Sequence, residues 1–340
     1  MAHFFWMIAL AAVVFAAETP PGLLTLQDEP LIQSPDRNWK SLGIGTGEIR
    51  KLNRVSRADG VESWNIGYSS DGLGIAGFMA QPIVEFDDDG KPKATYPAVI
   101  ICHGSAQGVT PAYREIAMEF ARRGYVAAAS AYRGQRGLAG HSEGAREYAK
   151  GETLDVLQLA QLVRKLEYVD SQRMAIWGQA EGGSIAAQII GRSNIFRAAV
   201  LVAPALFAGT PQYRYAGLRR LASLTAQISG KQMTDGMMVR ELRARDAFLN
   251  IPKIKTSTLI IAPESDPGAQ ELSLWIGALR GAGVEHRVLP FPGMFPEFMT
   301  AADTGLRPPN WAESREAAWA NTFSWIESYV PSEPGPAPAQ

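Results

Sequence analysis

The sequence of 340 residues has little cysteine and little histidine, with one and four copies respectively. A single cysteine excludes an intramolecular disulfide, so the fold has to be held by its hydrophobic core. Cys102 ends an apolar run that begins at Ala98, which favours a buried side chain over a reactive thiol. The histidines do not have the spacing of metal ligands, and we expect neither a metal nor another cofactor. They are His3, His103, His141 and His286.

An excess of either charge is also lacking, since 33 Lys and Arg stand against 34 Asp and Glu, giving a formal net charge of −1. Binding to nucleic acid or to an anionic membrane surface calls for a basic face, so we expect neither as a partner. Because 46% of the residues are hydrophobic, the chain can bury a large core. A single α/β domain of roughly 250 to 300 residues is an ordinary outcome at this length.

The first 17 residues form an apolar block without Lys or Arg, and the block ends in small residues before Glu18. It is too short for a comfortable transmembrane span and is typical of a cleaved secretory signal peptide, with Ala16 or Ala17 before the cleavage point. We therefore expect export to a periplasmic or extracellular location. The alternative is an uncleaved membrane anchor.

The rest of the chain divides by composition into three parts. Residues 18–58 are broken by several prolines and predict an extended lead-in, whereas residues 331–340 are rich in proline and predict a disordered tail. Between them, residues 59–330 predict one domain. Its first element is a hairpin, with strands from Glu62 to Tyr68 and from Leu73 to Met79 on either side of a Ser-Asp-Gly turn.

Continuous apolar runs alternate with helical patterns after this hairpin, which predicts a mostly parallel sheet covered by helices on both faces. The predicted strands are Ala98 to Cys102, Tyr125 to Ala131, Met174 to Trp177, Ala198 to Ala203, Thr258 to Ala262 and Val284 to Pro290. The predicted helices are Pro111 to Arg123, Glu152 to Lys165, Gly182 to Ile190, Gln270 to Leu279 and Trp311 to Tyr329.

The segment from Leu206 to Lys255 interrupts this alternation and predicts a small helical insertion, with helices from Leu218 to Ile228 and from Met237 to Phe248. In a doubly wound sheet it would lie above the carboxyl ends of the strands, where ligands bind, so it is a candidate lid. The alternative is that it packs on the edge of the sheet.

The stretch from Arg173 to Ile190 holds a short apolar run, a turn flanked by glycines and a helical pattern. This order is typical of a nucleophile elbow, G-x-S-x-G, in which a tight turn between strand and helix exposes one side chain. Here the pattern is Gly178-Gln-Ala-Glu-Gly182, so Ala180 stands where the attacking residue belongs.

Over about Ser63 to Tyr329 the chain resembles the catalytic domain of the prolyl oligopeptidase family of serine peptidases, with dienelactone-hydrolase-like proteins as relatives. The motifs that carry the resemblance are Ser70-Asp-Gly72, Tyr96-Pro-Ala-Val-Ile-Ile-Cys-His-Gly104, Arg123-Gly-Tyr125, Tyr132-Arg-Gly134, Gly151-Glu152 with Asp155, and Tyr168-Val-Asp170. The resemblance implies the α/β-hydrolase fold and a Ser, Asp and His triad.

Two of the three triad positions hold other residues. The resemblance implies that the serine position is Ala180, the acid is Asp266 and the histidine position, in Phe291-Pro-Gly-Met-Phe-Pro296, is Pro296. Alanine offers no attacking atom and proline offers no base, so the sequence predicts an inactive enzyme. The oxyanion hole implied by the resemblance would use the backbone N–H of Glu181 and one from the loop at Gly104 and Ser105.

The prediction is therefore a degenerate hydrolase whose pocket binds a small carbonyl or carboxylate ligand, a peptide or a protein partner. One alternative is an active hydrolase of esters or peptides that uses Ser105, Glu181 or His141. Another is a scaffold without a ligand, with the pocket above Ala180 filled by the insertion. Ser184, one helical turn after the elbow, suits helix packing better than catalysis.

Overall fold

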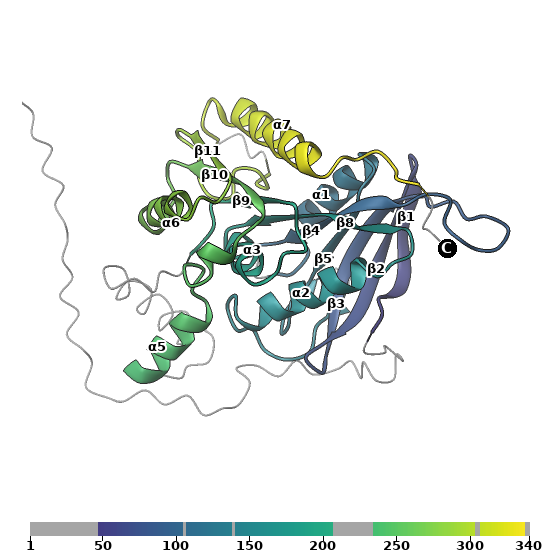
Figure 1. Cartoon of the computed structure of the whole chain (residues 1–340), viewed down its shortest axis with the longest axis horizontal. Coiled ribbons are helices and arrows are strands. Elements are labelled where there is room, and N and C mark those ends of the chain that lie inside the picture. The colour runs from purple at the N-terminus through teal and green to yellow at the C-terminus, as the bar shows by residue number, and fades with distance from the viewer. Residues whose placement is uncertain (1–46, 105–106, 138–139, 207–233, 303–306, 337–340) are drawn as a thin grey trace, which may run out of the picture.

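A computed structural model describes residues 47–104, 107–137, 140–206, 234–302 and 307–336. Its main feature is a nine-stranded sheet with the strand order β1-β2-β3-β5-β4-β8-β9-β10-β11 (Figure 1). The predicted signal segment, most of the predicted lead-in and the predicted helix from Leu218 to Ile228 lie outside the described residues. Among the described residues, no helix is both long and apolar enough to cross a membrane.

The parallel part of the sheet agrees with the predicted strands to within a few residues at most ends. It contains β4 (Tyr96–Cys102), β5 (Val126–Ser130), β8 (Val169–Gln179), β9 (Ala198–Val202), β10 (Ser257–Pro263) and β11 (His286–Phe291). The central strands are buried on both faces, which is why their apolar residues run without alternation. The mostly parallel α/β sheet is confirmed.

The amino-terminal strands pair in antiparallel fashion. The predicted hairpin is formed by β2 (Val61–Ser70) and β3 (Leu73–Pro82), and its turn residues Asp71 and Gly72 both have positive φ, 52° and 77°. Such a two-residue turn matches the twist of the flanking strands. The lead-in ends in a strand that the sequence did not predict, β1 (Arg50–Ala58), which pairs with β2 at the edge of the sheet. Two register shifts break its side-chain alternation, and much of it is exposed, so its pattern is weak.

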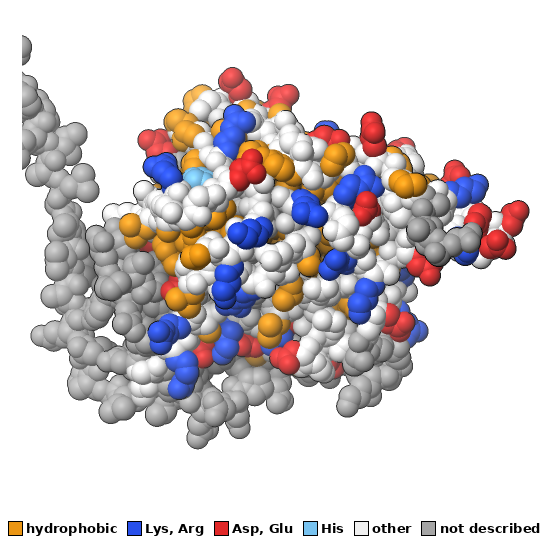
Figure 2. Space-filling view, in the orientation of Figure 1, with side chains coloured by type: hydrophobic (Ala, Val, Ile, Leu, Met, Phe, Trp, Pro, Cys, Tyr) orange, Lys and Arg blue, Asp and Glu red, His pale blue; other side chains and the backbone are white. Residues whose placement is uncertain are grey.

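Helices cover both faces of the sheet (Figure 1). One face carries α1 (Pro111–Arg122) and α7 (Trp311–Tyr329), and the other carries α2 (Gly151–Val163), α3 (Glu181–Arg192) and α6 (Ala269–Gly281). Each face has its own hydrophobic cluster, so the sheet separates two cores. On the surface in Figure 2, side chains of both charges are scattered over one face of the molecule.

The insertion and the tail complete the chain. In the insertion, α5 (Asp235–Ala244) lies where Met237 to Phe248 was predicted, followed by the short 3₁₀ helix η2 (Ile251–Lys253). A two-stranded ribbon, β6 (Arg136–Gly137) with β7 (Gly140–His141), lies in the loop after β5. Residues 207–233, which hold most of the candidate lid, are outside the described residues.

The tail differs from its prediction over residues 331–336, which are held against the domain instead of being disordered. Thr95 and Gly335 exchange backbone hydrogen bonds of 3.2 and 2.8 Å. Arg173 donates from Nη1 to the carbonyl oxygens of Pro331 and Glu333. A proline-rich segment has few N–H donors of its own, but its carbonyls can accept from a guanidinium, so composition alone predicted too much disorder.

Candidate functional site

The elbow predicted from the sequence is present in the backbone. Ala180 directly follows β8 and has φ 52° and ψ −117°, a conformation that a residue with a Cβ rarely adopts. The turn is fixed from several sides: the Ala180 N–H donates to the Val202 carbonyl at 2.9 Å, and its own carbonyl accepts from Ser184 and Ala205. The strained apex therefore persists with a methyl group in place of a nucleophile.

Three glycines allow the backbones around this apex to meet. A Cβ on Gly182 would overlap the carbonyl group of Cys102, and one on Gly178 would overlap the carbonyl group of Gly182. A Cβ on Gly104 would lie 2.7 Å from the Gln179 carbonyl oxygen and 2.9 Å from the Ala180 Cβ. The loop after β4 is thus in contact with the elbow, as an oxyanion loop needs to be.

The close approach at Gly182 predicts a large effect of one methyl group. Gly182→Ala is expected to lower the free energy of unfolding by about 1 to 3 kcal/mol, because the colliding atoms belong to the backbone and cannot rotate away. Urea unfolding measures this change. The matched control is Gly277→Ala in α6, where nothing lies within 4 Å of the added Cβ. It should be neutral or stabilising by up to about 1 kcal/mol, and equal losses in the two variants would contradict the packing described here.

The other two triad positions lie at the same edge of the sheet. Asp266 follows β10 and Pro296 follows β11, and these strands run parallel to β8 and β9. Their two loops are joined by the Ser265 N–H donating to the Met294 carbonyl at 3.0 Å. The Gln179 side chain donates from Nε2 to the Pro296 carbonyl at 2.8 Å, which ties the histidine position to the residue before the apex. Asp266 is half-buried, and its Oδ1 accepts from the Gly268 N–H at 2.8 Å.

The predicted oxyanion donors, the N–H groups of Glu181 and of the loop at Gly104, have different surroundings. Glu181 is the first residue of α3, so its N–H belongs to the first turn, where no carbonyl of the helix itself is available. The Gly104 N–H instead donates to the Tyr113 hydroxyl at 2.9 Å, so it is already used within the fold. Ser105 lies outside the described residues.

A model of the prolyl oligopeptidase family matches residues 111–294, which is more than half of the chain. The chain belongs to the prolyl oligopeptidase family. The matched region contains the elbow and Asp266 and ends two residues before Pro296. No curated protein matches the sequence.

Solved structures share the α/β-hydrolase fold with this prolyl oligopeptidase homologue. A Klebsiella pneumoniae protein described as a dienelactone hydrolase superposes with a TM-score of 0.55 and 16% identity, covering 79% of this chain and 99% of its own. Acetyl xylan esterase 1 of a Thermoanaerobacterium species gives 0.59 and 14%, covering 84% and 89%. The Pyrococcus horikoshii acylaminoacyl peptidase gives 0.57 and 16%, covering 80% of this chain and 42% of the peptidase. At such identities the likeness establishes the fold alone.

Ser184 and the histidines of the described residues are buried or half-buried in this family member. Ser184 is fully buried in α3. The His103 ring is buried and stacks on Tyr132 at 3.9 Å between ring centroids. His141 is half-buried in β7. His286 opens β11, with its Nδ1 2.7 Å from the Val284 carbonyl oxygen.

An ionic cluster beside the elbow was not predicted. Glu181 forms an ion pair with Arg146, whose guanidinium lies over the Tyr148 ring at 4.4 Å. Glu152 is fully buried and accepts backbone N–H bonds from Glu147 (2.6 Å), Tyr148 (3.1 Å) and Lys150 (3.2 Å). The Glu181 carboxylate, considered above as a substitute nucleophile, is therefore paired to a cation. The Gly151-Glu152 motif indicates one part of this cluster in the sequence. Arg146, the partner of Glu181, lies in no motif that would have indicated its role.

The buried carboxyl of Glu152 predicts a dependence of stability on pH. Burial, and then the carboxylate of Glu181, raise the pKa of Glu152 from 4.5 to about 8. Between these two values the unfolded chain has released the proton while the folded chain keeps it, so rising pH destabilises the fold. Glu152→Gln cannot ionise. The free energy of unfolding should therefore fall more steeply between about pH 5 and pH 8 in the parent than in this variant. Parallel slopes in urea unfolding would contradict the shift.

Proposed function

We propose that this chain is a catalytically inactive member of the prolyl oligopeptidase family which retains the elbow as a binding site. The observation that carries the proposal is the methyl group of Ala180 at the strained apex, with proline at position 296. Attack on a carbonyl needs a nucleophile and a base that takes its proton, and Ala180 and Pro296 supply neither. Removing either group from a serine protease lowers kcat by about 2 × 10⁶.

The ligand class we infer is a small molecule or peptide end with a carbonyl or carboxylate oxygen. Glu181 is the first residue of α3, and a free N–H at the positive end of a helix favours an anionic or carbonyl oxygen. The methyl group of Ala180 gives such an oxygen nothing to react with. For the location we propose export, on the basis of the apolar segment over residues 1–17.

The experiment is treatment of the full chain with a fluorophosphonate probe and, separately, with p-nitrophenyl acetate. We expect no labelled serine and no turnover above a buffer blank, whereas an active serine esterase run in parallel should show both. A labelled serine would overturn the proposal, and so would turnover that is lost on Glu181→Gln or on substitution of His141 or Ser105. In that case the family activity would proceed through non-standard residues.

Binding is tested separately with N-acetyl-alanine, which carries both a carbonyl and a carboxylate. Isothermal titration calorimetry should show saturable binding to the parent chain. Ala180→Trp should abolish it by filling the apex, while Gly277→Ala in exposed α6 should leave it unchanged. Binding that survives Ala180→Trp would place the ligand elsewhere.

A further inference from the structure

A second concave site lies between α1 and α7, away from the elbow. Arg123 and Tyr125 line it, and both come just before β5, at the amino ends of the parallel strands. The elbow follows β8 at the carboxyl ends. The two sites are therefore on opposite edges of the sheet, and nothing in the proposed function uses the second one.

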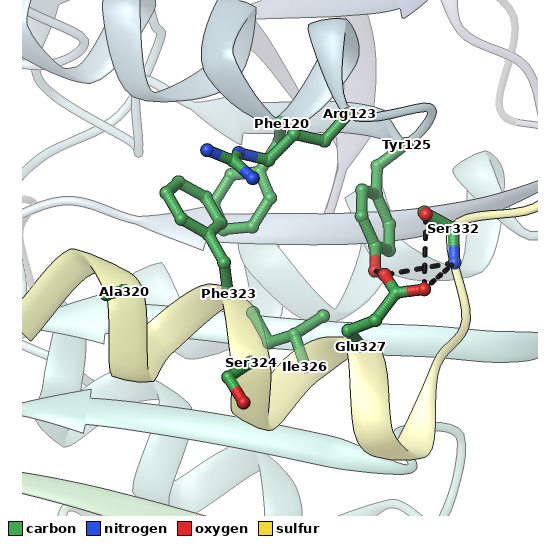
Figure 3. A pocket seen from close by; sticks show the side chains of 9 residues that line it. All are labelled: Phe120, Arg123, Tyr125, Ala320, Phe323, Ser324, Ile326, Glu327 and Ser332. Carbon is green, nitrogen blue, oxygen red and sulfur yellow. Dashed lines mark hydrogen bonds between the residues drawn. The ribbon is translucent and has the colours of Figure 1, made fainter.

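The pocket has a volume of about 550 Å³, within the roughly 300 to 1,000 Å³ of small-molecule sites. Its apolar wall is the partly exposed ring of Phe323 in α7, which is backed by the fully buried Phe120 of α1 and Ile326 of α7. The rings of Phe120 and Phe323 meet edge to face with centroids 5.3 Å apart, so the wall is fixed in shape (Figure 3).

A cation lies at one end of this wall. The Arg123 guanidinium is held over the Phe323 ring at 3.9 Å, and its Nε donates to Glu119 at 3.0 Å. Both contacts fix the position of the guanidinium. Its two terminal nitrogens have no hydrogen-bond partner among the described residues, which leaves the end of the guanidinium available to a ligand. A guanidinium with paired donors favours a carboxylate.

The opposite end carries a negative charge that is already satisfied. Glu327 accepts from the Tyr125 hydroxyl at 2.8 Å, from the Ser332 N–H at 3.0 Å and from the Ser332 hydroxyl at 3.2 Å (Figure 3). Although partial burial acts against it, these hydrogen bonds and the Arg123 charge lower the pKa of Glu327, so it stays ionised near neutral pH. A second anionic group at this end would be repelled, which restricts the ligand to one carboxylate.

We propose that the pocket between α1 and α7 binds a small amphipathic monocarboxylate, with its carboxylate on the terminal nitrogens of Arg123 and its apolar or aromatic body against Phe323. The apolar wall supplies the burial and the guanidinium supplies the orientation. Because Arg123 is about half exposed, the ion pair is screened by salt, and binding weakens as ionic strength rises.

The test is calorimetric titration of the full chain with 4-phenylbutyrate, beside 4-phenyl-1-butanol and phenylsuccinate as probes with no carboxylate and with two. We expect saturable binding of 4-phenylbutyrate and at least tenfold weaker binding of the other two. Arg123→Met keeps an apolar stem on Phe323 and should weaken 4-phenylbutyrate binding at least tenfold. Arg280→Met, in the last turn of α6 and exposed, is the matched control and should change nothing.

Two further variants separate this site from the elbow. Ala320→Trp, on the exposed lining of α7, should block binding by filling the pocket, and Ala180→Trp should leave it intact. Loss of 4-phenylbutyrate binding in Ala180→Trp but not in Arg123→Met would assign the ligand to the elbow and overturn the proposal. Absence of saturable binding to the parent chain would overturn it too, as would equal binding of the alcohol.

Discussion

The double substitution Ala180→Ser with Pro296→His is expected to give the chain esterase activity, with kcat/KM for p-nitrophenyl acetate at least about 10³-fold above the parent. A triad needs a strained apex, a base within reach and a carboxylate behind the base. The apex is present at φ 52°, and Asp266 follows β10. The Pro296 carbonyl accepts a hydrogen bond from the Gln179 side chain, next to the apex. The backbone of a histidine at position 296 would therefore lie near the apex. The expected gain is well below the roughly 10⁶-fold effect of a mature triad because the side-chain geometry has not been refined.

The single variants are the controls for this experiment. Ala180→Ser and Pro296→His alone should each stay within about tenfold of the parent, because nucleophile and base act as a unit. Asp266→Asn added to the double variant should return the rate toward that of the parent. A folded double variant without activity would show that the site lacks more of what catalysis needs than the serine and histidine side chains. Activity of Ala180→Ser alone would reveal a base other than position 296.

The second large effect is expected for Arg133→Met, which should lower the free energy of unfolding by about 3 to 5 kcal/mol. The Arg133 side chain is 5% exposed and forms an ion pair with the fully buried Asp155 at 2.9 Å. It also donates from Nε to the same carboxylate and from Nη1 to Glu147 at 2.8 Å. Removing the cation leaves the Asp155 carboxylate buried with hydrogen-bond donors but no counter-charge, which is costly. Urea unfolding of parent and variant measures the difference.

Two comparisons make this prediction specific. Arg122→Met removes exposed ion pairs to Glu115 and Glu119 and should cost at most about 1 kcal/mol. Arg133→Met combined with Asp155→Leu should recover part of the loss, because replacing both partners by apolar groups avoids the unpaired charge. An Arg133→Met variant as stable as Arg122→Met would mean that Asp155 is not held as an ionised group in the fold.

The fold was predictable where burial controls the sequence. The strands β4, β9 and β10 are buried along nearly their whole length, so continuous apolar residues indicated them. β1 was not predicted because most of its residues are exposed at an edge of the sheet and its register shifts twice. The ordered start of the tail was missed because its partners, Thr95 and Arg173, lie far away in the sequence.

The candidate site was likewise predictable only in part from the sequence. Spacing within a short segment was enough to locate Ala180, and a resemblance placed Asp266 and Pro296 in loops after strands. The contacts that define the site chemically join distant segments and left no local pattern. Arg146 with Glu181, Gln179 with the Pro296 carbonyl and Gly104 with the Tyr113 hydroxyl are such contacts. They arise when the sheet brings the ends of its strands together.

The lone cysteine has a practical consequence for telling the two binding sites apart. Cys102 is fully buried in β4 and burial raises its pKa, so its thiol should not react with a maleimide under native conditions. Glu333→Cys in the exposed, held part of the tail would then carry the only reactive thiol. A nitroxide attached there lies next to Ser332, which lines the α1 and α7 pocket. Its paramagnetic relaxation should broaden the NMR signals of a ligand bound in that pocket far more than those of a ligand at the opposite edge of the sheet.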